Sequence, residues 1–361
     1  MIYLYFIIIF IFSIYSYSLV DPNLTLINSP LWEYFRNYMV ILGYHQRAIS
    51  SIIYLVLVLI MFYFNFYFYK NYKKYNIIKL ALFSGLVLII SYPFLSHDIF
   101  NYMFDAKILT FYHKNPYFYK ALDFPKDSWL NFMHWTHRTY PYGPVFLPLT
   151  IIPSFLSFGK FILNFLFFKI FFFIFYYFST YFLNKINKKY AIFFATNPLI
   201  LIEGLVNCHN DLIAVFFGIT GIYFLSRKYI LSRILFLISA GIKYTTFPIL
   251  FLTKKINSKI NLVVLISIFL IILYMSFFIE IQPWYFLILF ILFPYFKNNY
   301  YLINIFFAGL LFSYYPFIAL GDWGMKSNII IKHNIIIAFF VINFIFLFLY
   351  NFINIKKNAK T

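Results

Sequence analysis

The run FILNFLFFKIFFFIFYY, residues 161–177, decides the fold class of this 361-residue chain. Similar apolar runs return along the whole length, at 55–62, 262–273 and 335–350. The chain is 63% hydrophobic and 11% charged, with a mean hydropathy of +0.82, a balance that no soluble globular fold tolerates. Outer-membrane barrels show alternating segments of about ten residues, and these runs do not alternate. The sequence therefore predicts an all-α, multi-spanning membrane protein.

The net charge and the single cysteine limit which partners and cross-links the protein can have. The formal net charge of +19 would indicate nucleic acid in a soluble protein, but the basic residues lie mainly in short loops between apolar runs. Such loops face the cytoplasm, so no nucleic-acid partner is expected. The single cysteine, Cys208, excludes an intramolecular disulfide and a cysteine metal cluster. The first 20 residues lack a basic region and a clear cleavage site, which favours an uncleaved span over a signal peptide.

Two ambiguous apolar pieces, 145–158 and 234–252, decide the topology. Placing the basic loops 184–190 and 227–233 in the cytoplasm requires that both pieces dip into the membrane and return. If each piece crossed once, the six basic residues of these loops would move outside. We therefore expect both termini in the cytoplasm and one integral membrane domain over 1–361. The ten predicted crossings are 2–20, 51–69, 80–96, 161–183, 191–206, 212–226, 261–279, 285–296, 300–319 and 335–354.

Acidic residues are scarce, 10 in 361, and in this topology all but Glu203 fall on the outer face or at its boundary. If the basic residues stay in the cytoplasm, the acids are free to lie on the outer side, so the charge asymmetry explains on which side of the membrane they fall. It does not explain why the acids come in compact polar patches. The longest polar segment, 97–144, becomes a large extracytoplasmic loop. Its first residues include four at a spacing that places them on one face of a helix: Asp98, Asn101, Tyr102 and Asp105.

Two interpretations fit the polar face of this helix. A carboxylate near apolar surface has a raised pKa, which suits it to accept a proton from a hydroxyl group, so Asp98 and Asp105 are candidate general bases. We expect this helix to lie in the outer membrane interface with its acidic stripe toward a cavity. The alternative is that the stripe is only the solvated face of this interfacial helix. The same loop ends HWTHRTYPYGP, residues 134–144, where His134, His137 and Arg138 are donors suited to phosphate or sugar hydroxyls. The prolines and glycine after them form a rigid aromatic turn that leads back into the membrane.

The next patch, NPLILIEGLVNCHND, covers residues 197–211. Asn197 precedes a proline and can cap a helix. An ionisable residue inside a span is a functional hypothesis by default, and the alternative is a buried structural network. His209 could also indicate a metal, but so loose a cluster favours hydrogen bonding over ligation. Four polar residues lie on or beside one helical face: Glu203, Asn207, Asn210 and Asp211.

Lys243 interrupts the apolar sequence GIKYTTFP, residues 241–248. An unpaired ammonium is costly there, so the side chain either snorkels to the interface or binds an anion, for which a lipid phosphate is a natural choice. Trp284 lies in EIQPWY, residues 280–285, at a predicted outer end. Tryptophan is expected in the interfacial belt, and its ring face also stacks well on sugars.

In this order the patches resemble the polyprenol-phosphate-sugar-dependent glycosyltransferases of the C-type membrane superfamily (GT-C), specifically bacterial and archaeal mannosyltransferases. That family has an Asp-x-x-x-Tyr stretch with Asn-Pro-Tyr, then Tyr-Gly-Pro, Asn-Pro-Leu with Glu and Asn-x-His-Asn-Asp, Lys with Pro, and Pro-Trp-Tyr. This chain matches it between about residues 90 and 290, with Asp98, Tyr102, Asp105, Asn115-Pro116-Tyr117, Tyr142-Gly143-Pro144, Asn197-Pro198-Leu199, Glu203, Asn207, His209-Asn210-Asp211, Lys243, Pro248 and Pro283-Trp284-Tyr285. It departs at Asp105-Ala106-Lys107, where related proteins often have Asp-Gly-Arg.

The resemblance implies a GT-C-like fold and an inverting transfer of a hexose, mannose by analogy, from a polyprenyl-phosphate donor to a lipid-linked or glycan acceptor. The expected site is extracytoplasmic, in the cell membrane and in contact with its lipids. Asp98 is the first choice of base and Asp105 the second, and Lys243, His209 and Arg138 would bind the donor phosphate. Sugar and acceptor would meet Tyr102, Asn115, Tyr142, Glu203, Asn207, Asn210, Asp211 and Trp284. No metal or cofactor is expected, because basic side chains can hold a lipid phosphate.

Two other functions compete with this one. A transporter or lipid-glycan flippase would suit the intramembrane Glu203 and Lys243 and the broken helices. However, no inverted repeat is visible, and most polar groups crowd one face instead of the midplane. An accessory subunit with a degenerate site is the other alternative, and the full set of patches disfavours it.

Overall fold

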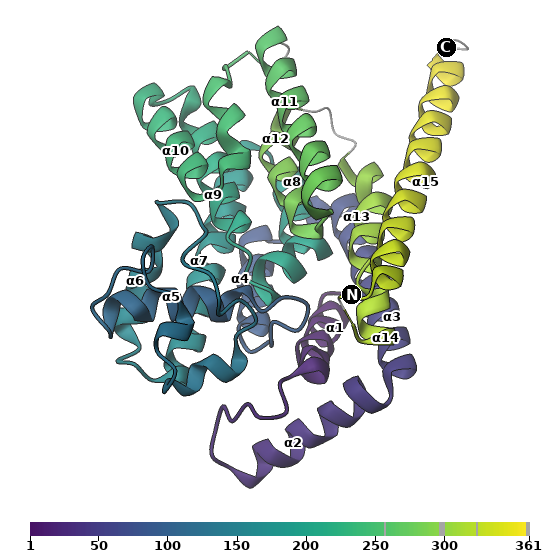
Figure 1. Ribbon diagram of the computed structural model, residues 1–361. Coiled ribbons are helices and arrows are strands. Elements are labelled where there is room, and N and C mark those ends of the chain that lie inside the picture. Colours follow the sequence, from purple (N-terminus) through teal and green to yellow (C-terminus); the bar gives the residue numbers. More distant parts are fainter. Residues whose placement is uncertain (256–257, 296–299, 323, 359–361) are drawn as a thin grey trace.

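The structure, a computed structural model, describes residues 1–255, 258–295, 300–322 and 324–358 (Figure 1). Within these ranges the regular elements are all helical, and no strand occurs. The helices are α1 (Ile2–Tyr15), α2 (Pro30–Val40), α3 (Arg47–Lys70), α4 (Ile77–Ile89), α5 (Asp98–Thr110), α6 (Phe146–Leu156), α7 (Phe161–Ile186), α8 (Lys188–Thr196), α9 (Asp211–Leu225), α10 (Tyr229–Ile242), α11 (Lys259–Met275), α12 (Leu289–Leu292), α13 (Asn304–Phe312), α14 (Tyr315–Leu320) and α15 (Lys326–Asn358). Short 3₁₀ or π turns connect them, of which the site uses η6 (Ile200–Val206), η7 (Tyr244–Phe251), η8 (Ser276–Glu280) and η9 (Pro283–Ile288).

The predicted multi-spanning, all-α membrane protein is confirmed. Six helical segments of the described residues are long and apolar enough to cross a bilayer: Ile2–Leu19, Arg47–Lys70, Phe161–Ile186, Lys259–Glu280, Tyr301–Leu320 and Lys326–Tyr350. The predicted span 191–206 is instead a broken segment, because α8 and η6 bend by 61° relative to each other. Three further predicted spans, 80–96, 212–226 and 285–296, correspond to shorter apolar helices, and residue 296 lies outside the described residues. The count of ten crossings therefore stays a prediction.

The helices α5 and α6 lie together against α7, while α15 runs along the opposite edge of the bundle beside α13 and α14 (Figure 1). The ambiguous piece 145–158 is α6. The ambiguous piece 234–252 divides at Lys243 into the end of α10 and the 3₁₀ turn η7, which contains Pro248. A proline cannot continue the α-helical hydrogen bonding, which agrees with the break.

The helices α9 and α10 form an antiparallel hairpin. The Ser232 hydroxyl donates to the Gly221 carbonyl at 2.7 Å, and the Ser239 hydroxyl donates to the Ala214 carbonyl at 2.7 Å. The expected loop 227–233 is therefore mostly helix, because α10 already begins at residue 229. The hairpin brings the first residue of α9 next to the residue that follows α10.

The Tyr142-Gly143-Pro144 turn docks on the last turn of α10. The Val145 N–H donates to the Gly241 carbonyl at 3.2 Å. A Cβ atom on Gly143 would lie 2.1 Å from the Gly241 carbonyl oxygen and 2.7 Å from that of Ile242. Both neighbours are backbone atoms that cannot rotate away, so only glycine permits this approach of the segment 97–144 to residue 243.

We expect Gly143→Ala to destabilise the protein by about 1–3 kcal/mol, the usual cost of overpacking, because the added methyl group pushes the turn off α10. The measurement is the thermal unfolding midpoint of the purified protein in detergent. Gly324→Ala is the control, since its Cβ would meet a side-chain oxygen of Asp322 at 3.3 Å and no backbone atom closer. Equal midpoints for the two variants would contradict the close approach at Gly143.

Candidate active site

Asp98 begins α5 at the predicted position. An acid in the first turn is favoured by the free N–H groups and positive end of the helix, and the Asp98 N–H donates to the Ser96 hydroxyl at 3.3 Å. The Asp98 side chain is 19% exposed, whereas Asn101, Tyr102 and Asp105 are buried. The alternative of a solvated acidic face is therefore wrong, because this face of α5 packs inside the protein.

A sharp turn separates η6 from α9. Cys208 has a φ of 58°, a left-handed conformation that is uncommon for a non-glycine residue. The turn lets the His209 N–H donate to the Glu203 carbonyl at 2.9 Å, and the Asn207 side-chain amide donates to the Glu203 carboxylate at 3.1 Å. Asp211 then starts a new helix. The predicted common face of Glu203, Asn207 and Asp211 is therefore wrong: the first two are neighbours and the third belongs to α9.

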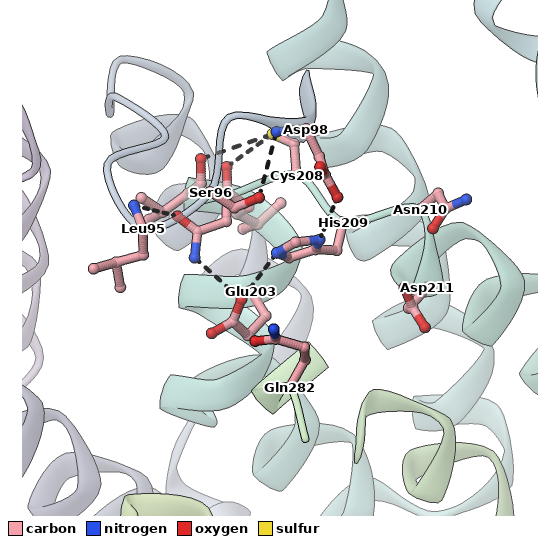
Figure 2. A network of polar contacts seen from close by, with 12 residues as sticks. Leu95, Ser96, Asp98, Glu203, Cys208, His209, Asn210, Asp211 and Gln282 are labelled. Carbon is pink, nitrogen blue, oxygen red and sulfur yellow. Dashed lines mark hydrogen bonds and ion pairs between the residues drawn. The ribbon is translucent and has the colours of Figure 1, made fainter. Parts of the chain in front are cut away.

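His209 lies at the centre of the polar network in Figure 2. Its Nδ1 atom is 3.6 Å from the Asp98 carboxylate, and its Nε2 atom is 3.2 Å from the Glu203 carboxylate. Its ring stacks on Trp284 with the ring centroids 4.0 Å apart and the planes 16° from parallel. Residues from α5, η6 and η9 thus surround one imidazole.

The charges of this network follow from its geometry. Burial lowers the pKa of His209, but the contacts with Asp98 and Glu203 outweigh burial and raise it to about 9. Burial raises the pKa of Asp98, but the neighbouring His209, with smaller contributions from Lys243 and Arg138, holds it below its usual value. At neutral pH, Asp98 is therefore ionised and His209 is an imidazolium, a cation that the Trp284 ring face also stabilises.

We expect thermal stability to fall as the pH rises from about 6.5, the ordinary histidine pKa, to about 9. The pKa of His209 is higher in the folded protein than in the unfolded chain, so its contribution is complete below the unfolded value and is lost as the pH passes the folded value. The measurement is the unfolding midpoint as a function of pH, compared with His209→Gln. The difference between the two proteins should shrink across this window, and a constant difference would contradict a raised pKa at His209.

Lys243 and Asp211 form an ion pair at the open end of the α9–α10 hairpin. The Lys243 Nζ atom lies 2.8 Å from the Asp211 carboxylate, with the lysine side chain 21% exposed and the aspartate 3% exposed. The ammonium also lies 5.7 Å from the Tyr285 ring centroid. Lys243 therefore has a buried acidic partner and is not a snorkelling side chain, and it borders the network around His209.

Tyr102 and Tyr142 connect α5 to this region. The Asn210 N–H donates to the Tyr102 hydroxyl at 3.5 Å, and the Tyr102 and Tyr142 rings lie 4.8 Å apart. Burial and then the charges of Asp98 and Asp105 raise the pKa of Tyr142, which places its hydroxyl within the field of both carboxyl groups. That hydroxyl is buried and has no hydrogen-bond partner among the described residues, which is uncommon for a buried polar group.

Asp105 differs from Asp98 in its charge state. Burial raises its pKa to about 8, only partly opposed by the positive charge of Arg138. At neutral pH the carboxyl group is therefore mostly protonated. The raised pKa expected of both carboxyl groups is thus found at Asp105 and not at Asp98, where the contact with His209 lowers it. Because Asp98 is the ionised one of the two, its charge state favours it over Asp105 as the base.

Two of the predicted site residues remain to be placed, Arg138 and Asn115. Arg138 lies 4.9 Å from the Trp135 ring centroid, and its charge influences Asp98 and Asp105, so it belongs to the cluster. Asn115 does not: it is exposed, and its side-chain oxygen accepts from the Tyr117 N–H at 3.0 Å in a local turn.

Two buried lysines are part of the site's surroundings and were missed by sequence reasoning. Lys332 of α15 lies 2.7 Å from the Glu280 carboxylate and 2.9 Å from the Gln282 amide oxygen, just before Trp284. Lys169 of α7 contacts the end of η6. Each interrupts an apolar run, which is the signal that singled out Lys243.

These observations define a class: a multi-spanning membrane protein that gathers acidic, imidazole and ammonium groups in one largely buried cluster. A family model described as "Alpha-(1->6)-mannopyranosyltransferase, N-terminal domain" matches residues 24–256, and the chain belongs to this family. The protein is thus a membrane glycosyltransferase of a mannosyltransferase family, which confirms the resemblance. The match includes Asp98, His209 and Lys243 and ends before Trp284. Comparison with curated proteins and with solved structures gives no significant match.

Proposed function

We propose that the protein transfers mannose, with inversion, from a polyprenyl-phosphate donor to a lipid-linked or glycan acceptor at the extracytoplasmic face of the cell membrane. The observation that carries this proposal is the ionised Asp98, 3.6 Å from the buried imidazolium of His209 and close enough to Lys243 for its charge to be felt. A base and two cations beside one another suit the transfer of a sugar from a phosphate.

In the proposed reaction the acceptor hydroxyl oxygen attacks C1 of the mannose as the bond from C1 to the phosphate oxygen breaks. The hydroxyl proton passes to Asp98, and the bonding electrons stay on the polyprenyl phosphate. Attack on the face opposite the phosphate inverts the configuration at C1. A positioned base of this kind contributes about 10²- to 10⁴-fold to the rate.

The leaving phosphate gains negative charge in the transition state, so cations aimed at it stabilise that state more than the ground state. Lys243 is the first candidate, because its ammonium is partly exposed and is held by a single carboxylate, that of Asp211, among the contacts of the described residues. His209 and Arg138 add positive charge on the side of Asp98. The donor phosphate would share or displace Asp211 as the partner of Lys243.

The sugar would lie against the aromatic and amide groups around these charges. The Tyr142 hydroxyl, which has no partner among the described residues, the Tyr102 hydroxyl and the Asn210 side chain are suitable hydrogen-bond groups. One face of the Trp284 ring is stacked on His209, so a sugar would have to use the rest of this ring. Glu203 would hold the Nε2 side of the His209 ring, and Asn207 would hold Glu203 by donating to its carboxylate.

An apolar groove suits the lipid chain of the donor. It lies between η7 and α11 and has a volume of about 510 Å³. Its first lining residue in the sequence, Phe247, is four residues after Lys243. Its wall is mostly hydrophobic, formed by Phe247, Pro248, Phe251, Lys259, Ile260, Val263, Val264 and Ser267. A polyprenyl chain in this groove would leave its phosphate near Lys243.

The test is to incubate the purified protein with polyprenyl-phosphate-mannose or polyprenyl-phosphate-glucose and a membrane lipid extract, and to identify the glycosylated product by mass spectrometry. We expect a mannosylated product that is unchanged when a chelator is present, since no step requires a metal. A product formed only from a nucleotide sugar, or no product from either lipid donor, would overturn the proposal.

A further inference from the structure

Lys169 is a buried cation that the proposed reaction does not use. It lies in the first half of α7, a helix long and apolar enough to span a membrane, and is 1% exposed. Its ammonium donates to the Leu205 carbonyl at 2.5 Å, the Val206 carbonyl at 3.1 Å and the Ser91 hydroxyl at 2.9 Å. Burial of an ammonium at such a place is costly unless its donors are satisfied, and these three acceptors satisfy it.

Two of the three acceptors are the last carbonyls of η6. The final carbonyls of a helix lack partners within it and carry the negative end of its dipole, so an ammonium placed there stabilises this end. The next residues form the left-handed turn at Cys208 and then His209. Cys208 is the titratable group of this turn that faces Lys169, and Ser91 ties the same ammonium to the segment between α4 and α5.

We propose that Lys169 is a positioning residue: by holding the end of η6, it fixes the turn that places the His209 imidazole between Asp98 and Glu203. Lys169 touches none of these three side chains in the contacts of the described residues, and it acts through the backbone of Leu205 and Val206. Its consequence for the rate rests on the proposed function, but its consequence for His209 does not.

The test is the titration of His209 by NMR in protein labelled at the histidine side chains, with His209→Gln to assign its signal among the seven histidines. The groups that face His209 are Asp98 from α5, Glu203 from η6 and the Trp284 ring. In Lys169→Met the end of η6 loses its cation, the turn loosens and the contacts with both carboxylates lengthen. We therefore expect the titration midpoint of His209 to fall from about 9 toward its ordinary value of about 6.5.

The matched control is Phe168→Leu, the preceding residue of α7, which is also fully buried but whose side chain has no group that can donate to the Leu205 and Val206 carbonyls. It should lose thermal stability and leave the His209 midpoint unchanged, while Lys169→Arg, which keeps the charge and the donors, should restore most of the wild-type midpoint. If Lys169→Met folds and its His209 midpoint equals that of the wild type, the proposal is overturned.

A second variant covers the case in which Lys169→Met does not fold. Ser91→Ala keeps the ammonium and removes one of its three acceptors, so a smaller fall of the His209 midpoint supports the proposal and an unchanged midpoint overturns it. Where transfer is measured, kcat of Lys169→Met should drop roughly ten- to hundredfold, as expected when a cation that stabilises the leaving phosphate is misplaced. Absence of transfer in the wild type would overturn the proposed function. The NMR titration would still test whether Lys169 positions His209.

Discussion

Replacing Asp98 by asparagine should lower the rate of mannose transfer by about 10³-fold, within the range by which a positioned base contributes. Asparagine has nearly the same shape as aspartate but cannot accept the proton of the acceptor hydroxyl. The protein should still fold, because the Asp98 side chain is more exposed than that of its partner His209. The measurement is kcat of the purified variant with polyprenyl-phosphate-mannose and a lipid acceptor.

Asp105→Asn is the matched comparison. Since burial raises the pKa of Asp105 to about 8, its carboxyl group is mostly neutral at pH 7, and an amide is a close substitute for a neutral carboxyl. We expect kcat to change by less than about tenfold at this pH. The opposite result, with Asp105→Asn inactive and Asp98→Asn active, would make Asp105 the base. A transporter that depends on Glu203 and Lys243 should be indifferent to both substitutions.

The fold class follows from composition, because a chain with long apolar runs and few charges can satisfy its backbone in a bilayer only as helices or as a closed barrel. The arrangement of those helices does not follow. Hydropathy averages over a window and is insensitive to direction, so it reads 191–206 as one span although α8 and η6 bend by 61°. It also reads 227–233 as a loop because the residues are basic, although most of them belong to α10.

The residues of the candidate site stand out in the sequence for a different reason. A charge within apolar sequence is costly unless it has a partner or a function, so Glu203 and Lys243 stand out by residue type alone. Asp98 stands out because acids are scarce in this chain and because it shares a helical spacing with Asp105. The same signal was present at Lys169, inside the very run that predicts the fold class. The high mean apolarity of that run conceals the single charge within it.

The geometry of the site was not predictable. The expectation that Glu203, Asn207 and Asp211 share a helical face assumes a continuous helix, and the left-handed Cys208 ends it. Neither glycine nor proline marks this turn, so it lacks the usual sequence signal. Contacts of the folded chain accompany the turn instead: the Leu95 N–H donates to the Asn207 side-chain oxygen, and the Asn207 amide donates to the Glu203 carboxylate.

Lys243→Met should lower kcat by about 10²- to 10³-fold, the usual loss when one donor to a developing negative charge is removed, and should also raise the KM for the lipid donor. The variant leaves Asp211 as a buried carboxylate without its ammonium partner, which by itself destabilises a fold. For this reason the informative protein is Lys243→Met combined with Asp211→Asn, which removes both charges. It should have a thermal midpoint close to that of the wild type and remain as inactive as Lys243→Met alone.

Two further variants separate a phosphate-binding lysine from one that only neutralises Asp211. Lys228→Met removes an exposed cation at the other end of α10, and it should leave kcat and the donor KM unchanged. Asp211→Asn alone frees the Lys243 ammonium from its competing carboxylate, so the donor KM should stay the same or fall. If the double variant regains most of the wild-type rate, then the ammonium of Lys243 serves only to balance Asp211, and the leaving phosphate must be bound by His209 and Arg138 instead.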